Sequence, residues 1–101
     1  MPDRILIVDD DPVQRRLLHG QVSRMGYETA VASGGVEALD MLSGPARRFA
    51  AVVLDLVMPD LDGLGVLAAM RERAIAVPVI VQTARGGIDT VVGAMRAGAF
   101  D

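Results

Sequence analysis

The sequence predicts an α/β protein in which a doubly wound parallel sheet carries helices on both faces. Short apolar runs that suit buried strands alternate four times with segments that suit helices. Three of the four apolar runs end directly at an Asp or Thr residue, and Gly, Pro and Asp gather between the runs. Because 51% of the residues are hydrophobic and only 3% are aromatic, Val, Leu, Ile, Ala and Met have to build the core.

The first strand is expected at residues 4–8, a continuous apolar run of the kind that is buried on both faces of a parallel sheet. Asp11 followed by Pro12 is typical of a helix start, with Asp as the N-cap and Pro in the first helical position. This helix should stop at Gly26, a common C-terminal signal. Its apolar face is expected to comprise Val13, Leu17, Leu18, Val22 and Met25.

The remaining elements follow the same logic of apolar runs and Gly or Pro boundaries. They are expected as strand, helix, strand, helix, strand and helix at residues 28–32, 36–42, 50–54, 64–70, 78–82 and 87–95.

Composition narrows the classes of function. The 101 residues suit one domain, and the net charge of −3 argues against direct binding to nucleic acid, which needs clustered positive charge. No apolar run approaches the roughly 18 residues that a membrane span requires. The chain has no Cys, and residues 1–4 leave no room for a signal peptide before the first strand, so a cytoplasmic protein is expected.

Oxygen-bearing side chains follow three of the four predicted strands, namely Asp9-Asp10, Asp55 and Thr83. Ligands of open parallel sheets bind outside the carboxyl ends of the strands, so these side chains should meet in one crevice. Clustered carboxylates repel unless one is protonated or a cation lies among them. Hard oxygen ligands without His or Cys favour Mg²⁺.

Asp55 is the best candidate for a nucleophile, because a carboxylate on a central strand beside a metal can form an aspartyl phosphate. Thr83 could donate its hydroxyl to a phosphoryl oxygen, and the small Ala84 leaves an approach path. Single Asp residues are more often caps or turn formers: Asp11 is read as a cap, and Asp60 and Asp62 as turn residues. His19, the only histidine, is expected on the surface.

In combination these residues resemble the receiver domains of response regulators, the CheY-like family. The groups that carry the resemblance are Asp9-Asp10, Asp55 with Met58-Pro59, Asp62-Gly63 and Thr83-Ala84. The resemblance covers residues 1–101 as one receiver domain. Residues 94–101 are also similar to those of nitrogen-regulator-type (NtrC-like) transcription activators.

The resemblance implies a flavodoxin-like sheet of order 2-1-3-4-5 with five helices. It also implies that a sensor histidine kinase phosphorylates Asp55 in a two-component system and that an output domain, expected to act in transcription, responds. Such a receiver catalyses its own phosphorylation and is not a turnover enzyme.

The same resemblance implies the roles of the site residues. Asp10, Asp55 and the backbone carbonyl of Val57 would bind Mg²⁺ directly, and Asp9 would bind it through water. Thr83 would be the switch hydroxyl, with Ala84 leaving access for the phosphoryl group.

The sequence departs from the family in having no Lys, and it stops before the fifth strand, the fifth helix and the aromatic switch residue. We therefore expect a C-terminally truncated receiver that is poorly phosphorylated. The run at residues 79–81 would become a sheet edge, and apolar surface beside the first helix would be uncovered. A homodimer or domain-swapped oligomer is expected.

Two alternatives remain open. A haloacid-dehalogenase-type phosphatase would use Asp60 and Asp62, although Met58-Pro59 separates that motif from its strand. A pseudo-receiver would only bind other proteins, although the acidic residues argue against it.

Overall fold

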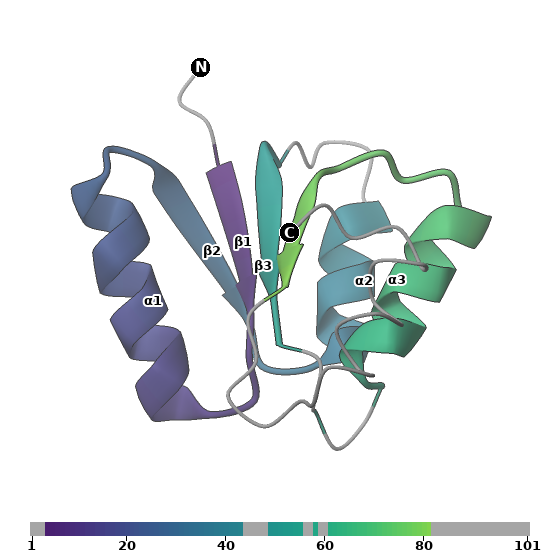
Figure 1. Cartoon of the computed structure of the whole chain (residues 1–101), viewed down its shortest axis with the longest axis horizontal. Helices are drawn as coiled ribbons and strands as arrows, with labels where there is room; N and C mark the ends of the chain where they lie inside the picture. The colour runs from purple at the N-terminus through teal and green to yellow at the C-terminus, as the bar shows by residue number, and fades with distance from the viewer. Residues whose placement is uncertain (1–3, 44–48, 56–57, 59–60, 82–101) are drawn as a thin grey trace.

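The computed structural model describes residues 4–43, 49–55, 58 and 61–81. Seven elements alternate along this part of the chain (Figure 1). In order, they are β1 (Arg4–Val8), α1 (Pro12–Arg24), β2 (Glu28–Ala32), α2 (Gly35–Ser43), β3 (Ala51–Leu54), α3 (Gly63–Glu72) and β4 (Val79–Val81). Each element lies within two residues or so of its predicted position. The helix predicted at residues 87–95 falls outside the described residues.

The four strands are parallel and lie in the order β2-β1-β3-β4. This confirms the predicted α/β fold class and the first four strands of the 2-1-3-4-5 order; a fifth strand is not among the described residues. α1 covers one face of the sheet, and α2 and α3 pack together on the other (Figure 1). From β1 the chain crosses to β2 on one side, and from β3 it crosses to β4 on the other side. The crevice between the carboxyl ends of β1 and β3 is therefore the switch point, where sheets of this kind bind ligands.

Alternation along the strands divides the core into two layers. Leu6, Val8, Val52 and Leu54 face α2 and α3, where they pack with Leu39, Leu67 and Met70 in the larger cluster. Ile5, Ile7 and Val53 face α1 and form the smaller cluster with Leu18. Both faces of β1 and β3 are thus buried, which explains why these strands are continuous apolar runs.

α1 begins as predicted, because the side chain of Asp11 accepts a hydrogen bond from the amide of Val13 and Pro12 follows the cap. It ends before Gly26, whose φ of 95° lies in the left-handed region that glycine adopts without strain.

The predicted apolar face of α1 is wrong in part. Leu18 is buried and Val22 packs beside it, one turn further along the helix. Val13, Leu17 and Met25 are 67%, 56% and 71% exposed. Residues 17 and 18 project about 100° apart on a helix, so one line of contact with the sheet cannot bury both.

Among the residues that the structure describes, no helix has both the length and the apolar character needed to cross a bilayer.

Candidate metal centre

The ends of β1 and β3 position two of the three predicted carboxylates. The amide of Asp9 donates to the carbonyl of Ala32 at 3.1 Å, and the amide of Asp55 donates to the carbonyl of Val8 at 3.0 Å. Both Asp residues therefore continue the parallel hydrogen-bond pattern one residue beyond their strands. Their backbones are fixed by the sheet, and only the side chains project into the crevice.

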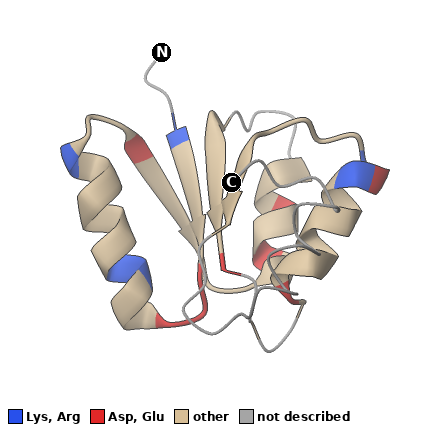
Figure 2. Ribbon diagram, in the orientation of Figure 1, with Lys and Arg blue, Asp and Glu red and all other residues tan. Residues whose placement is uncertain are grey.

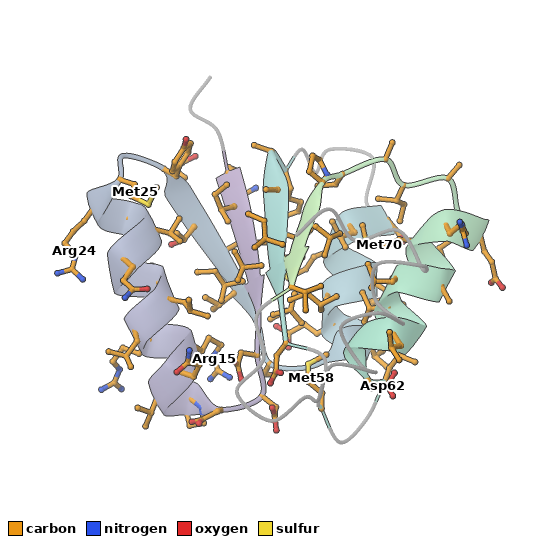
Figure 3. All side chains as sticks on the ribbon, viewed as in Figure 1. Arg15, Arg24, Met25, Met58, Asp62 and Met70 are labelled. Atoms are coloured by element: carbon orange, nitrogen blue, oxygen red, sulfur yellow. The ribbon has the colours of Figure 1, made fainter. Side chains whose placement is uncertain are left out.

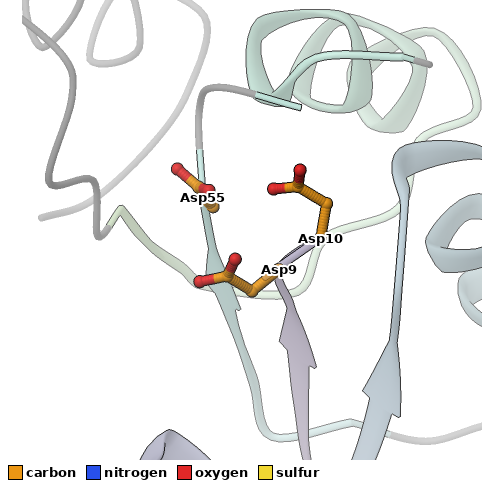
Figure 4. Close-up of side chains that lie close together, drawn as sticks. All are labelled: Asp9, Asp10 and Asp55. Atoms are coloured by element: carbon orange, nitrogen blue, oxygen red, sulfur yellow. The ribbon is translucent and has the colours of Figure 1, made fainter. Parts of the chain in front are cut away.

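Asp9, Asp10 and Asp55 converge at this edge of the sheet (Figure 4). Each offers a carboxylate oxygen, and these oxygens all lie within 4.8 Å of one another. Asp9 and Asp55 are 4% and 7% exposed, and Asp10 is half-buried. Figure 2 shows this acidic region at the carboxyl ends of the strands, away from the N-terminus. Sequence reasoning placed these three residues in one crevice, and the structure brings them together.

The crevice disfavours the ionised form of Asp9. Burial raises the pKa of Asp9 above its ordinary value, and the nearby charges of Asp55, Asp10 and Asp11 raise it further. A hydrogen bond from the amide of Asp11 to Oδ1 of Asp9, at 2.9 Å, acts in the opposite direction and lowers the pKa. Desolvation is the larger cause, whereas the sequence argument considered only repulsion between carboxylates.

The arrangement fits a small divalent cation. Oxygens on opposite sides of an octahedral Mg²⁺ are about 4.2 Å apart, given metal–oxygen distances near 2.1 Å. The three carboxylate oxygens lie within 4.8 Å of one another, close enough for one ion to contact them directly or through a bound water. A divalent charge would also relieve the repulsion that raises the pKa of Asp9. Carboxylates are hard ligands of the kind that Mg²⁺ and Ca²⁺ prefer.

Arg15, a residue that sequence reasoning missed, supports the backbone at Asp9. Nη1 of Arg15, in the first half of α1, donates to the backbone carbonyl of Asp9 at 2.9 Å. In Figure 3, Arg15 lies between α1 and the sheet, whereas Arg24 projects outward from the far end of the helix. The sequence offers the adjacent pair Arg15-Arg16 with no signal to distinguish them, because only the packing of α1 decides which one faces the sheet.

α2 packs closely against the segment that leads into α3. A Cβ atom added to Gly35 would lie 2.2 Å from the carbonyl oxygen of Leu61 and 2.9 Å from a methyl group of Val66. Only glycine permits this approach without a backbone shift. The contact places Leu61, just before α3, directly against the start of α2.

The remaining residues singled out from the sequence are either outside the described residues or have local structural contacts. Val57, Thr83 and Ala84 lie outside the described residues, so their predicted roles stay predictions. Asp62 caps α3 by accepting a hydrogen bond from the amide of Gly65 at 2.9 Å, which agrees with its reading as a local structural residue. His19 is exposed, as expected, and its Nδ1 is hydrogen-bonded to the hydroxyl of Thr29.

Comparison with known proteins identifies the family of this fold and site. The sequence profile of the response regulator receiver domain matches residues 5–101. Response regulator MprA from Mycobacterium sp. (strain KMS) is 45% identical over 101 residues, which are 100% of this chain and 43% of that protein. The chain therefore spans less than half the length of this curated relative.

Comparison with solved structures leads to the same family. A response regulator receiver protein from Pseudomonas putida is 29% identical with a TM-score of 0.89, over 100% of this chain and 84% of that one. A response regulator from Burkholderia pseudomallei is 28% identical with a TM-score of 0.84, over 96% of this chain and 56% of that one. The Burkholderia structure contains a phosphorylated aspartic acid, a calcium ion and citrate.

Proposed function

Because the chain belongs to the response regulator receiver domain family, we propose that it accepts a phosphoryl group on Asp55 with the help of Mg²⁺ bound at Asp9, Asp10 and Asp55. The single observation that carries this proposal is the convergence of three carboxylate oxygens within 4.8 Å at the carboxyl ends of β1 and β3. The phosphorylated aspartic acid and cation of the Burkholderia relative support the same chemistry.

Asp55 is the nucleophile in this proposal. One of its carboxylate oxygens attacks the phosphorus of a phosphohistidine or acyl phosphate, and the bond from phosphorus to the donor's nitrogen or oxygen breaks as the aspartyl phosphate forms. Hydrogen bonding of the Asp55 amide to β1 holds the nucleophile in place. When bound, Mg²⁺ would neutralise charge on the phosphoryl oxygens.

The other residues bind and orient. Asp10 and the carbonyl of Val57 would bind the metal directly and Asp9 through water. Thr83 would donate its hydroxyl hydrogen to a phosphoryl oxygen, with Ala84 leaving the approach open. These assignments rest on the family pattern, and the burial of Asp9 supports its part in a site that needs a cation.

The test is phosphoryl uptake from acetyl phosphate with Mg²⁺, followed by intact-mass spectrometry. We expect one added phosphoryl group in the wild type, formed slowly because the chain has no Lys to pair with the phosphoryl group. Asp55→Asn should abolish uptake. Asp62→Asn is the matched control, because Asn caps helices as well as Asp does and should leave uptake unchanged. Uptake that survives in Asp55→Asn would refute the proposal.

The phosphatase alternative makes the opposite prediction. It requires turnover of a phosphate ester that is lost in Asp60→Asn and retained in Asp55→Asn. The capping hydrogen bond of Asp62 supports the receiver reading, since it gives this carboxylate a local structural role.

The partners follow from the family. We propose a sensor histidine kinase as phosphoryl donor and a cytoplasmic location. We also propose an output in transcription, carried by an output domain outside residues 1–101, since these residues match only 43% of the relative MprA. For a receiver with this role, acceptance of one phosphoryl group rather than repeated turnover is expected.

We also propose that the chain self-associates. Val13 and Leu17 on α1 are 67% and 56% exposed, and Ile80 on β4, at the other edge of the described sheet, is 44% exposed. These are exposed apolar side chains that a second copy would cover. Light scattering at tens of micromolar should give a mass above that of the monomer, and Leu17→Glu should reduce it. A monomeric wild type would contradict this proposal.

A further inference from the structure

We propose that Arg15 is a positioning residue of the metal centre, where it fixes the peptide that joins Asp9 to Asp10. This inference rests on the proposed Mg²⁺ site and adds a residue that is not one of its ligands. Its basis is the hydrogen bond of 2.9 Å from Nη1 of Arg15 to the carbonyl oxygen of Asp9.

The contact acts where the regular backbone pattern stops. The amide of Asp9 is bonded to β2 and Oδ1 of Asp9 accepts from Asp11, so the residue is held on its amino side and by its side chain. Its carbonyl belongs to the next peptide, and the orientation of that peptide sets the direction in which the side chain of Asp10 leaves the backbone. Arg15 holds this carbonyl from α1. Asp10 itself lies between β1 and α1, in neither element.

Electrostatics and positioning predict opposite signs for the loss of Arg15. A guanidinium group near the crevice repels a divalent cation, so removal of its charge alone would strengthen Mg²⁺ binding. Removal of a hydrogen bond that orients the ligands would weaken it, as loss of outer-shell partners does at other metal sites. The sign of the change therefore distinguishes the two effects.

Arg16 provides the matched control. It is the next residue on the same helix, carries the same charge and is exposed. Arg15→Met and Arg16→Met each remove one guanidinium group and keep an unbranched apolar stem, whereas Arg15→Lys restores a cationic donor at the same position.

The experiment is a titration of the ¹⁵N-labelled chain with MgCl₂, followed by amide chemical shifts, together with thermal unfolding in EDTA. Arg15→Met should weaken the Kd for Mg²⁺ roughly tenfold. Arg16→Met should leave the Kd unchanged or slightly tighter, and Arg15→Lys should recover most of the loss.

Other outcomes overturn the inference. A tighter or unchanged Kd in Arg15→Met would do so, and a lower unfolding temperature in EDTA with an unchanged Kd would identify a merely structural role. Asp55→Asn distinguishes this failure from failure of the proposed function. If the wild type shows no Mg²⁺ binding that Asp55→Asn removes, the metal centre itself is wrong, and the role of Arg15 falls with it.

Discussion

At the scale of single residues, Asp9 combines structural order with electrostatic cost. Its amide and one carboxylate oxygen are hydrogen-bonded, yet burial and three neighbouring carboxylates raise its pKa. In the folded chain without metal, ionised Asp9 is therefore less favourable than in the unfolded chain. A bound cation would reverse this penalty.

We predict that Asp9→Asn stabilises the metal-free chain at neutral pH. The raised pKa means that the native state holds the proton more tightly than the unfolded state, so the contribution of Asp9 to stability is full below the unfolded pKa and is lost as pH rises through the folded pKa. Asn removes this loss and still accepts from the amide of Asp11. Urea unfolding in EDTA should show a larger gain at about pH 7 than at about pH 4. Equal gains at both would contradict the assignment.

The residues that sequence reasoning found and missed differ in what determines them. Asp9, Asp10 and Asp55 could be predicted because each follows an apolar run, and strand ends in a parallel sheet share one edge. Arg15 could not, because its contact depends on how α1 packs against the sheet. Val57, Thr83 and Ala84 lie outside the described residues, so their predicted roles still rest on the family pattern alone.

At the scale of elements, strand and helix positions were predictable, and the burial of α1 was not. Apolar runs and capping residues are local signals, so they locate the elements well. Which apolar residues of a helix are buried depends on what packs against it. α1 contacts the sheet through Leu18 and Val22, and leaves Val13 and Leu17 exposed.

The close contact between Gly35 at the start of α2 and Leu61 before α3 leads to a prediction about stability. Gly35→Ala should destabilise the chain by about 3 kcal/mol, because the new methyl group would meet backbone rather than a flexible side chain. Gly20→Ala in α1 is the control, since the nearest atom to its added Cβ is the end of Arg24 at 3.9 Å. It should stabilise by about 0.5–1 kcal/mol. Urea unfolding measures both, and a neutral Gly35→Ala would disprove the close contact.

At the scale of the whole molecule, the metal centre joins elements that are far apart in sequence. Asp9 and Asp10 follow β1, whereas Asp55 follows β3, with α1, β2 and α2 between them. Unfolding separates these carboxylates, so an ion that needs all three binds only the native state. Metal binding and folding are then linked.

We predict that Mg²⁺ raises the unfolding temperature. At ten times its Kd, the ion should stabilise the chain by about 1.4 kcal/mol. For a domain of this size, that corresponds to roughly 6–10 °C in Tm. Calorimetry with MgCl₂ and with EDTA provides the measurement. Asp10→Asn should lose most of the rise, and an equal rise in that variant would assign the ion to another place.

The separation of the backbones of Asp9 and Asp55 also follows from the pairing of β1 with β3. Neighbouring strands run about 4.8 Å apart, a distance that peptide geometry imposes on every sheet. The backbones of Asp9 and Asp55 keep this spacing one residue beyond the strands, because their amides still bond across to the adjacent strand. The main chain thus sets the distance between the two backbones that carry Asp9 and Asp55, and rotation of their side chains can then bring the carboxylate oxygens closer together or move them apart to fit a cation.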